Sequence, residues 1–220
     1  MRGVGIAAVV AVALATATTV VASLWPLVGW AMVERARQTR DPGLIVSAAS
    51  AGQTVWFAAF AAILAAFVMV VIWSHRARRN LDAVPEARPA LSSGWAIAGW
   101  FVPFANLVVP YLVMADIART SLSRPRTPIQ VVAWWSGWLV FWSGWIGELV
   151  CSYVRYAHAE PSFGWFDYGN DALFRRLIGE YQRQLIPGSL MAVGIAVAGV
   201  ALITLVRRIS NAQQAGLAET

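Results

Sequence analysis

The chain has 220 residues, of which 59% are hydrophobic and only 13% are charged, and its mean hydropathy is +0.60. Because a soluble domain carries about 25% charged residues, this composition excludes an ordinary soluble protein and indicates an integral membrane protein. The net charge is +6, and all 17 basic residues are Arg. They cluster beside apolar segments, which is typical of anchors at lipid headgroups and not of a basic stripe that binds nucleic acid.

Four apolar segments are predicted to be transmembrane helices. They cover residues 8–30, 54–73, 129–150 and 185–206, and each offers about the 20 apolar residues that cross roughly 30 Å of hydrocarbon. Arg2 followed by an apolar run resembles a signal peptide, but the uncharged run is longer than a signal-peptide core. We therefore expect the first segment to remain as an uncleaved helix.

A further segment, residues 94–116, begins as an apolar and aromatic stretch, GWAIAGWFVPFANLVVPY, but contains residues that break a helix. Its candidate functional or structural residues are Trp100, Pro103, Asn106 and Pro110. Each proline removes a backbone donor, and broken backbone at membrane depth survives only where protein or water satisfies it. The side-chain amide of Asn106 can supply such bonds. Two arrangements remain open: a re-entrant or interfacial helical hairpin, and a kinked span that crosses the bilayer.

The broken segment has a structural and a functional interpretation. In the structural one, its prolines and its asparagine only shape a turn. In the functional one, the segment forms a pore or a substrate site, because broken helices expose dipole ends and carbonyl groups to a ligand.

The third predicted span carries a stripe of tryptophans, Trp134, Trp138, Trp142 and Trp145. Their spacing of four, four and three residues keeps them on one face of a helix. Such a stripe is typical of helix packing or of lipid contact. The alternative is a wall for an apolar or cationic ligand.

Two acidic side chains near membrane segments are further candidates, because charges inside a membrane are costly and often functional. Glu148 lies near the end of the third span, with Arg155 two helical turns later. Asp116 ends the broken segment, with Arg119 one turn later. Both arrangements favour interfacial salt bridges over a proton or ion site.

The loop before the last span begins with aromatic residues and ends in an amphipathic pattern. The aromatic residues are Tyr156, Phe163, Trp165, Phe166 and Tyr168. Asp171 can cap a helix that breaks at Pro187. Its apolar residues recur at helical spacing and are Leu173, Phe174, Leu177, Ile178, Tyr181 and Leu185. We expect a short amphipathic helix in the membrane interface, with docking of a partner as the alternative.

No motif of an enzyme or of a cofactor site occurs in the sequence. Gly-rich phosphate loops, zinc helix motifs and nucleophile elbows are missing, and His75 and His158 have no ligand-like neighbours. The single cysteine, Cys151, excludes an intramolecular disulfide or a thiolate cluster within one chain. We therefore expect no catalytic residue, no cofactor, no bound metal and no nucleic acid.

The distribution of arginines between the loops favours four spans over five. With four spans and an inside N-terminus, ten arginines lie inside and seven outside, whereas five spans give nine against eight. Because arginine-rich loops stay in the cytoplasm, we expect both termini in the cytoplasm and the protein in the plasma membrane. Residues 1–210 then form one membrane domain, and residues 211–220 form a mobile polar tail.

Residues in and around the broken segment resemble a known family. They are Arg79 and Asn80, then Trp95, Gly99-Trp100-Phe101, Pro103, Asn106 and Pro110, then Trp134-Trp135, Val206-Arg207-Arg208-Ile209 and Gln213. Over roughly residues 50–214 the chain is similar to the bacterial, largely actinobacterial, membrane proteins catalogued as domain of unknown function 4328. The resemblance implies a multi-span plasma-membrane protein, and it implies no activity and no catalytic residues.

We predict an all-α integral membrane protein with four transmembrane helices and one broken segment, or with five spans if that segment crosses. Its predicted role is non-enzymatic: a membrane-embedded interaction or envelope component that contacts the lipid bilayer and either other membrane proteins or itself. The alternative is a small transporter or channel subunit with its site at residues 94–116. A membrane enzyme is the third hypothesis.

Overall fold

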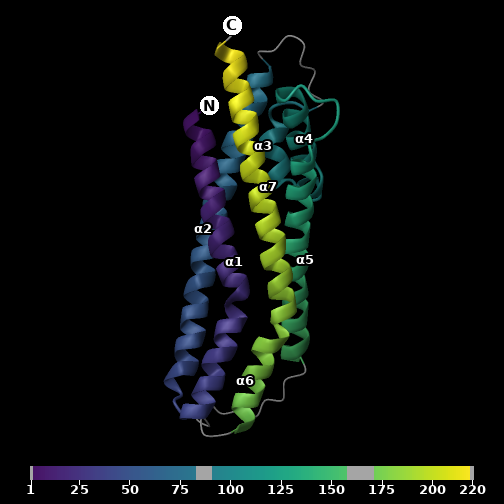
Figure 1. The fold of residues 1–220 in the computed structure, drawn as a ribbon. Helices are drawn as coiled ribbons and strands as arrows, with labels where there is room; N and C mark the ends of the chain where they lie inside the picture. Colours follow the sequence, from purple (N-terminus) through teal and green to yellow (C-terminus); the bar gives the residue numbers. More distant parts are fainter. Residues whose placement is uncertain (1, 83–90, 158–170, 219–220) are drawn as a thin grey trace. The chain divides into compact units, whose positions relative to one another are not determined.

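The computed structural model describes residues 2–82, 91–157 and 171–218, and within these ranges the chain forms helices and turns and no strand, as predicted (Figure 1). In chain order the elements are α1 (Arg2–Thr39), α2 (Gly43–Leu81), α3 (Trp95–Phe101), the 3-10 helix η1 (Ala105–Leu107), α4 (Val109–Ser121), α5 (Ile129–Ala157), α6 (Asp171–Arg183) and α7 (Leu185–Ala218). The aromatic loop residues 158–170 lie outside the described residues.

Three helical stretches of the described chain are long and apolar enough to cross a membrane: Gly3–Thr39, Gly43–Leu81 and Asp171–Ala215. The Trp-rich α5 has 29 residues but is not one of the three, since tryptophan is amphipathic and contributes little to a mean hydropathy. The helices extend beyond the predicted spans, because their polar ends continue the backbone hydrogen bonding past the apolar stretch.

The chain divides into two compact units. The first holds residues 1–16, 61–137 and 196–220, and the second holds residues 17–60 and 138–195. The short elements α3, η1 and α4 lie wholly in the first unit and α6 lies wholly in the second, whereas α1, α2, α5 and α7 contribute residues to both.

The first unit packs its core between α4 and the long helices. Its fully buried side chains come from α2, α4, α5 and α7 and are Trp73, Met114, Ile117, Val131, Leu205 and Ile209. The indole Nε1 of Trp73 donates a hydrogen bond to Ser210 Oγ at 3.0 Å. In a membrane, where lipid is as apolar as a helix surface, such interhelical contacts and bonds supply much of the association energy.

The second unit is held by α6 and by close backbone contacts. Phe174 is fully buried against Val33 and Ala36 of α1, and Leu177, Ile178 and Tyr181 pack beside it. The apolar face of α6 is thus covered by its own chain. The break after α6 lies at Gln184 and not at the predicted Pro187, because a proline fits the first turn of the following helix.

Two glycines allow helices of the second unit to approach closely. A Cβ atom at Gly188 would collide with the carbonyl oxygen of Ser23, so the small residue lets α7 approach the backbone of α1 closely. On α5 the close contact is at Gly144, where a Cβ would lie 2.9 Å from the carbonyl oxygen of Pro187. Gly147 on the same helix makes no such contact, since none of the described atoms lies within 4 Å of its Cβ position.

Large apolar side chains cover outward-facing parts of α1 and α2. Those exposed over half of their surface include Ile6, Val10, Leu14, Val21, Phe57, Phe60 and Val68. A soluble protein rarely exposes so much contiguous apolar surface, whereas a lipid-facing helix requires it. The surface therefore agrees with the composition in indicating a membrane protein.

Candidate functional site

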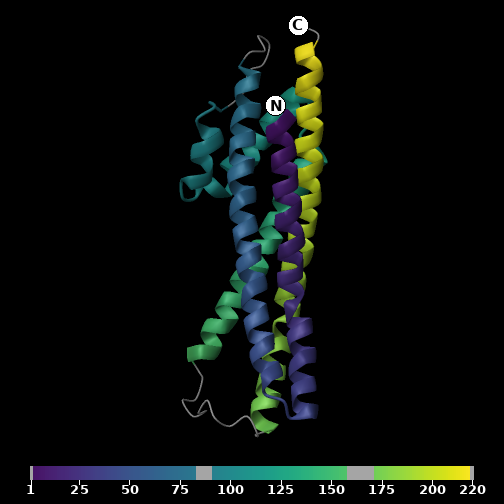
Figure 2. The same ribbon diagram turned by 90° about the vertical axis from the view of Figure 1, so that its left-hand side faces the viewer.

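Residues 94–116 fold into a helical hairpin rather than one continuous helix. The 7-residue α3 and the 13-residue α4 are joined by η1 and pack on one another, so a Cβ at Gly99 would lie 2.9 Å from Val109 Cβ. Figure 2 shows this hairpin, in teal, alongside the C-terminal part of α2. A helix of 7 residues spans about 10 Å and one of 13 about 20 Å, so neither crosses roughly 30 Å of hydrocarbon.

The two prolines of the hairpin mark where one helix ends and the next begins. Val102 has the extended backbone that a residue before proline prefers, and α3 ends there, before Pro103. Pro110 lies in the first turn of α4, where a missing N–H costs no helical hydrogen bond. Between them Phe104 has a φ of 63°, a left-handed conformation that is rare for a bulky residue.

The broken backbone of the hairpin is satisfied by other backbone groups and not by Asn106. The Ala105 N–H donates to the Pro103 carbonyl at 2.7 Å, and the Asn106 N–H donates to the Val102 carbonyl at 3.0 Å. The side chain of Asn106 is exposed and makes no hydrogen bond with the described part of the chain. The backbone groups of the turn therefore make the hydrogen bonds that were predicted for the side-chain amide of Asn106.

Trp100 packs the hairpin against two long helices, α2 and α5. Its ring meets Phe67 of α2 edge-on, with centroids 5.5 Å apart, and lies 6.2 Å from the ring of Trp134 on α5. Phe67 also contacts Phe101, at 5.7 Å. Because Trp134 is only 4% exposed, the first tryptophan of the predicted stripe is a packing residue.

A polar network joins α2, α4 and α7 of the first unit. Asn80 Nδ2 donates to Gln213 Oε1 at 3.1 Å. Gln213 Nε2 donates to the Ala77 carbonyl at 3.1 Å and to Ser121 Oγ at 2.8 Å. Only the presence of Asn80 and Gln213 in the family pattern marked these positions beforehand.

Arg78, near the end of α2, contacts the described residues that lead into the hairpin. Its side chain is almost fully buried, forms an ion pair with Asp82 at 2.6 Å, and donates twice to the Leu91 carbonyl, at 3.0 and 2.7 Å. His75 Nδ1 lies 3.2 Å from the Ser93 carbonyl. These contacts fix the start of the hairpin on α2, and no pattern in the sequence indicates them.

Asp116 is more buried than an interfacial acid would be. It is 8% exposed and forms the predicted ion pair with Arg119, at 3.5 Å, one turn along α4. The pair lies in the same unit as Trp100, Pro103, Asn106 and Pro110.

Glu148 borders a cavity of about 230 Å³ in the second unit. Its Oε1 accepts a hydrogen bond from Ser152 Oγ at 3.1 Å, while the side chain of its predicted partner Arg155 lies outside the described residues. The cavity is lined by Ala22, Ser23, Pro26, Trp56, Trp145, Glu148, Gln184, Gly188 and Met191. No group of three or more His, Cys, Asp or Glu that could hold a metal ion occurs among the described residues.

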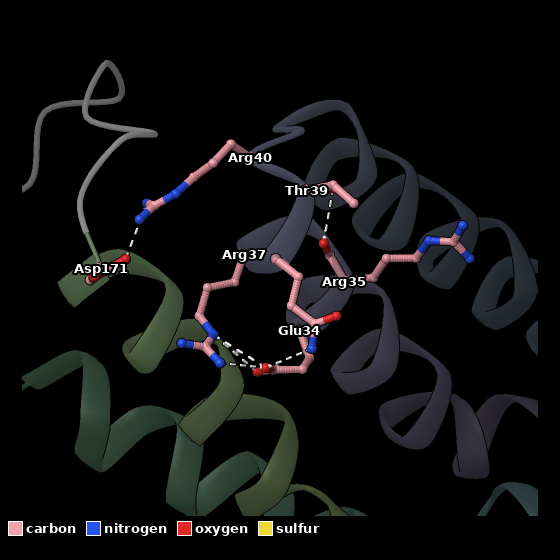
Figure 3. A network of polar contacts seen from close by, with 7 residues as sticks. Glu34, Arg35, Arg37, Thr39, Arg40 and Asp171 are labelled. Carbon is pink, nitrogen blue, oxygen red and sulfur yellow. Dashed lines mark hydrogen bonds and ion pairs between the residues drawn. The ribbon is translucent and has the colours of Figure 1, made fainter.

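A polar cluster lies at the turn between α1 and α2, in the second unit (Figure 3). Arg40 Nη1 reaches Asp171 Oδ1 at the start of α6, at 3.1 Å, and Glu34 pairs with Arg37 at 2.6 Å. These side chains are largely exposed to solvent, so each pair contributes little to stability. Arginines at such a turn are typical of the ends of membrane spans.

A comparison with protein families matches residues 36–211 to the model described as "Domain of unknown function (DUF4328)". The match covers most of the chain, so the protein belongs to this family, and it begins earlier than the resemblance suggested, taking in the first loop. No protein of curated function and no solved structure matches the chain.

Proposed function

We propose that this protein is a non-enzymatic component of the plasma membrane, with four spans, whose hairpin at residues 94–116 enters the bilayer from the cytoplasmic side and returns. The hairpin is its contact surface for another membrane protein or for a second copy. The observation that carries the proposal is the hairpin itself: two short helices, folded on each other and fastened to α2 and α5, with an apolar tip.

The path of the chain supports four spans. The chain enters the first unit along α2 and leaves it along α5, and the whole segment between these helices belongs to that unit. Both ends of the chain also belong to it. In this arrangement α5 is the third span, and the termini and the hairpin share the arginine-rich cytoplasmic side.

The composition of the hairpin tip supports insertion into the bilayer. Phe104 is 86% exposed, and Phe101, Leu107 and Val108 are each more than half exposed. Exposing such side chains to water is unfavourable, whereas lipid or an apolar partner accepts them.

Cysteine accessibility tests the topology. In a Cys151→Ser background, single cysteines replace Ser92 or Ser123, on the two sides of the hairpin, and intact cells are labelled with a membrane-impermeant thiol reagent. Both positions are expected to stay protected, while a control cysteine at Ser162 in the aromatic loop is labelled. Labelling at one of the two hairpin positions would show a fifth crossing and refute the four-span proposal.

Photo-crosslinking tests the contact surface. A photoreactive side chain at Phe104 is expected to capture a fixed protein partner or a second copy, whereas one at Phe57, an equally apolar position that is 74% exposed on α2, captures lipid. Equal capture from both positions would mean that the tip contacts only lipid.

A small transporter is the second candidate function, and the observation that favours it is the cavity beside Glu148. It does not rest on the hairpin, where the predicted substrate residue Asn106 is exposed at the surface. Flux measured in reconstituted vesicles with Glu148→Gln and Asn106→Leu separates the two locations: loss only in the first variant places the pathway at the cavity.

A further inference from the structure

The net charge of the chain lies entirely in the first unit. The sequence ranges of the second unit hold seven arginines and seven acidic residues, whereas those of the first unit hold ten arginines and four acidic residues. The ten arginines are Arg2, Arg76, Arg78, Arg79, Arg88, Arg119, Arg124, Arg126, Arg207 and Arg208, and the four acids are Asp82, Glu86, Asp116 and Glu219. The excess of positive charge therefore belongs to one unit, where it attracts anions.

Most arginines of the first unit have no acidic partner in the described structure. Arg78 pairs with Asp82 at 2.6 Å, and Arg119 pairs with Asp116 at 3.5 Å. The side chains of six others are exposed and make no ion pair or hydrogen bond with the described residues, and these are Arg76, Arg79, Arg124, Arg126, Arg207 and Arg208. We call them the six unpaired arginines. Their charge is left for an anion from outside the chain.

The second unit shows that arginines near membrane helices need not leave their charge unmatched. Three of its arginines form ion pairs with acids of the same unit, which are Arg37 with Glu34 at 2.6 Å, Arg40 with Asp171 at 3.1 Å and Arg183 with Glu180 at 2.7 Å. The unmatched charge is thus a feature of the first unit rather than of arginines in this protein generally.

The polar network around Gln213 brings the unpaired arginines to one end of the first unit. It joins Gln213 of α7 to Ala77 and Asn80 of α2 and to Ser121 at the end of α4. Each of the six unpaired arginines lies within six positions of one of these residues along the chain. Six residues of a helix span about 9 Å, so the six side chains share one end of the unit.

The neighbours of these arginines place them at the level of lipid headgroups. Ile72 is 39% exposed and lies four residues before Arg76 on α2, and Val200 is 65% exposed and lies seven residues before Arg207 on α7. Residues four or seven apart share one face of a helix. Each face therefore changes from exposed apolar residues to arginine within two turns, as a lipid-facing helix does where hydrocarbon meets headgroups. The apolar stem of an arginine can then lie on the helix while its guanidinium group reaches the headgroup.

We propose that the six unpaired arginines bind the headgroups of anionic phospholipids in preference to zwitterionic ones, with the acyl chains along the exposed apolar faces of α2 and α7. A guanidinium group donates in a fork that matches two oxygens of a phosphate. A zwitterionic headgroup carries its own cation, which competes for that phosphate, whereas an anionic headgroup has an unmatched negative charge. The proposal is independent of the partner of the hairpin and of the number of spans.

Native mass spectrometry of the purified full-length protein tests this preference. The protein in detergent micelles receives equal amounts of phosphatidylglycerol and phosphatidylcholine with the same acyl chains, and the bound lipids are counted. Phosphatidylglycerol is expected to be retained at least about fivefold more, because each arginine near a headgroup favours the anionic lipid by about that factor. Equal retention of the two lipids overturns the proposal, and this comparison needs no variant.

Matched double variants then locate the site. Arg76→Gln with Arg207→Gln is expected to lower the preference for phosphatidylglycerol by at least about threefold, and these side chains make no contact whose loss would impair folding. The control is Arg35→Gln with Arg175→Gln, which removes two exposed and equally unpaired arginines of the second unit and is expected to change the preference less. A wild-type preference in the first variant, or an equal loss in the control, overturns the assignment.

A soluble competitor separates a lipid site from a phosphate site. Glycerol 3-phosphate carries the phosphate without the acyl chains, and about a hundredfold excess is expected to leave phosphatidylglycerol bound, because the chains add burial of apolar surface. Displacement of the lipid by this competitor would show a site for soluble phosphates and overturn the lipid proposal.

Discussion

Removing the indole of Trp100 is expected to loosen the hairpin from the rest of the first unit. The Trp100→Ala variant loses the ring contacts to Phe67 at 5.5 Å and to Trp134 at 6.2 Å. Each aromatic pair is worth about 0.5–1.5 kcal/mol, so the two together stabilise the docked hairpin by about 1–3 kcal/mol. The hairpin can therefore open locally while the long helices stay folded.

A buried thiol on the hairpin measures that opening. Ala96 on α3 is fully buried, and a cysteine placed there in the Cys151→Ser background reacts with a thiol reagent only when the hairpin opens. A loss of 1–3 kcal/mol is expected to raise the labelling rate by about 5- to 150-fold in Trp100→Ala. The matched control is Trp95→Ala, on the same short helix and without a ring contact to the described residues. Equal rates in the two variants would refute the role assigned to Trp100.

Three further substitutions test the backbone and the interhelical contacts. Phe104→Gly is expected to raise the stability measured by thermal unfolding by about 1 kcal/mol, because glycine adopts a positive φ without strain, and an unchanged or lowered midpoint would contradict this. Gly188→Ala is expected to lower the free energy of unfolding by about 1–3 kcal/mol in denaturant, because the added methyl group overpacks against α1. The control Gly147→Ala, with open space around it, is expected to lower it little, and equal losses in the two variants would contradict this packing. Gln213→Leu removes three hydrogen bonds and is expected to lower the unfolding midpoint more than the control Gln214→Leu. Equal midpoints in the two variants would contradict the role assigned to Gln213.

The long helices and the location of the hairpin could be predicted because both follow from local patterns. Apolar runs of membrane length predict helices, and Pro103 and Pro110 predict a break between two of them. The amphipathic helix also followed from the spacing of Phe174, Leu177 and Ile178, although its end was placed at Pro187. In a sequence, a proline in the first turn of a helix cannot be distinguished from a proline that ends a helix. The difference depends on whether the residues before the proline are already helical.

Contacts between residues distant in the sequence could not be predicted in the same way. Asn80 and Gln213 are 133 positions apart, and no period or motif indicates that α2 and α7 place them together. The cavity brings together Ser23 of α1, Trp56 of α2, Glu148 of α5 and Gln184 at the break between α6 and α7, so its lining depends on the packing of the bundle. Glu148 was singled out from its position near a span, but its surroundings came only from the structure.

The prolines of the described helices affect the backbone differently in the hairpin and in α1. In the described helices, Pro110 and Pro187 lie in first turns, where they cost no hydrogen bond, and Pro26 is the one that lies inside a helix. An interior proline costs about 3 kcal/mol or more in a helix, and in a membrane the released carbonyl needs another partner. That carbonyl belongs to Ala22, which lines the cavity beside the buried hydroxyl of Ser23. The hairpin satisfies its own backbone and presents an apolar tip, which suits a contact surface, whereas α1 has an interior proline and a buried serine hydroxyl without a hydrogen-bond partner among the described residues.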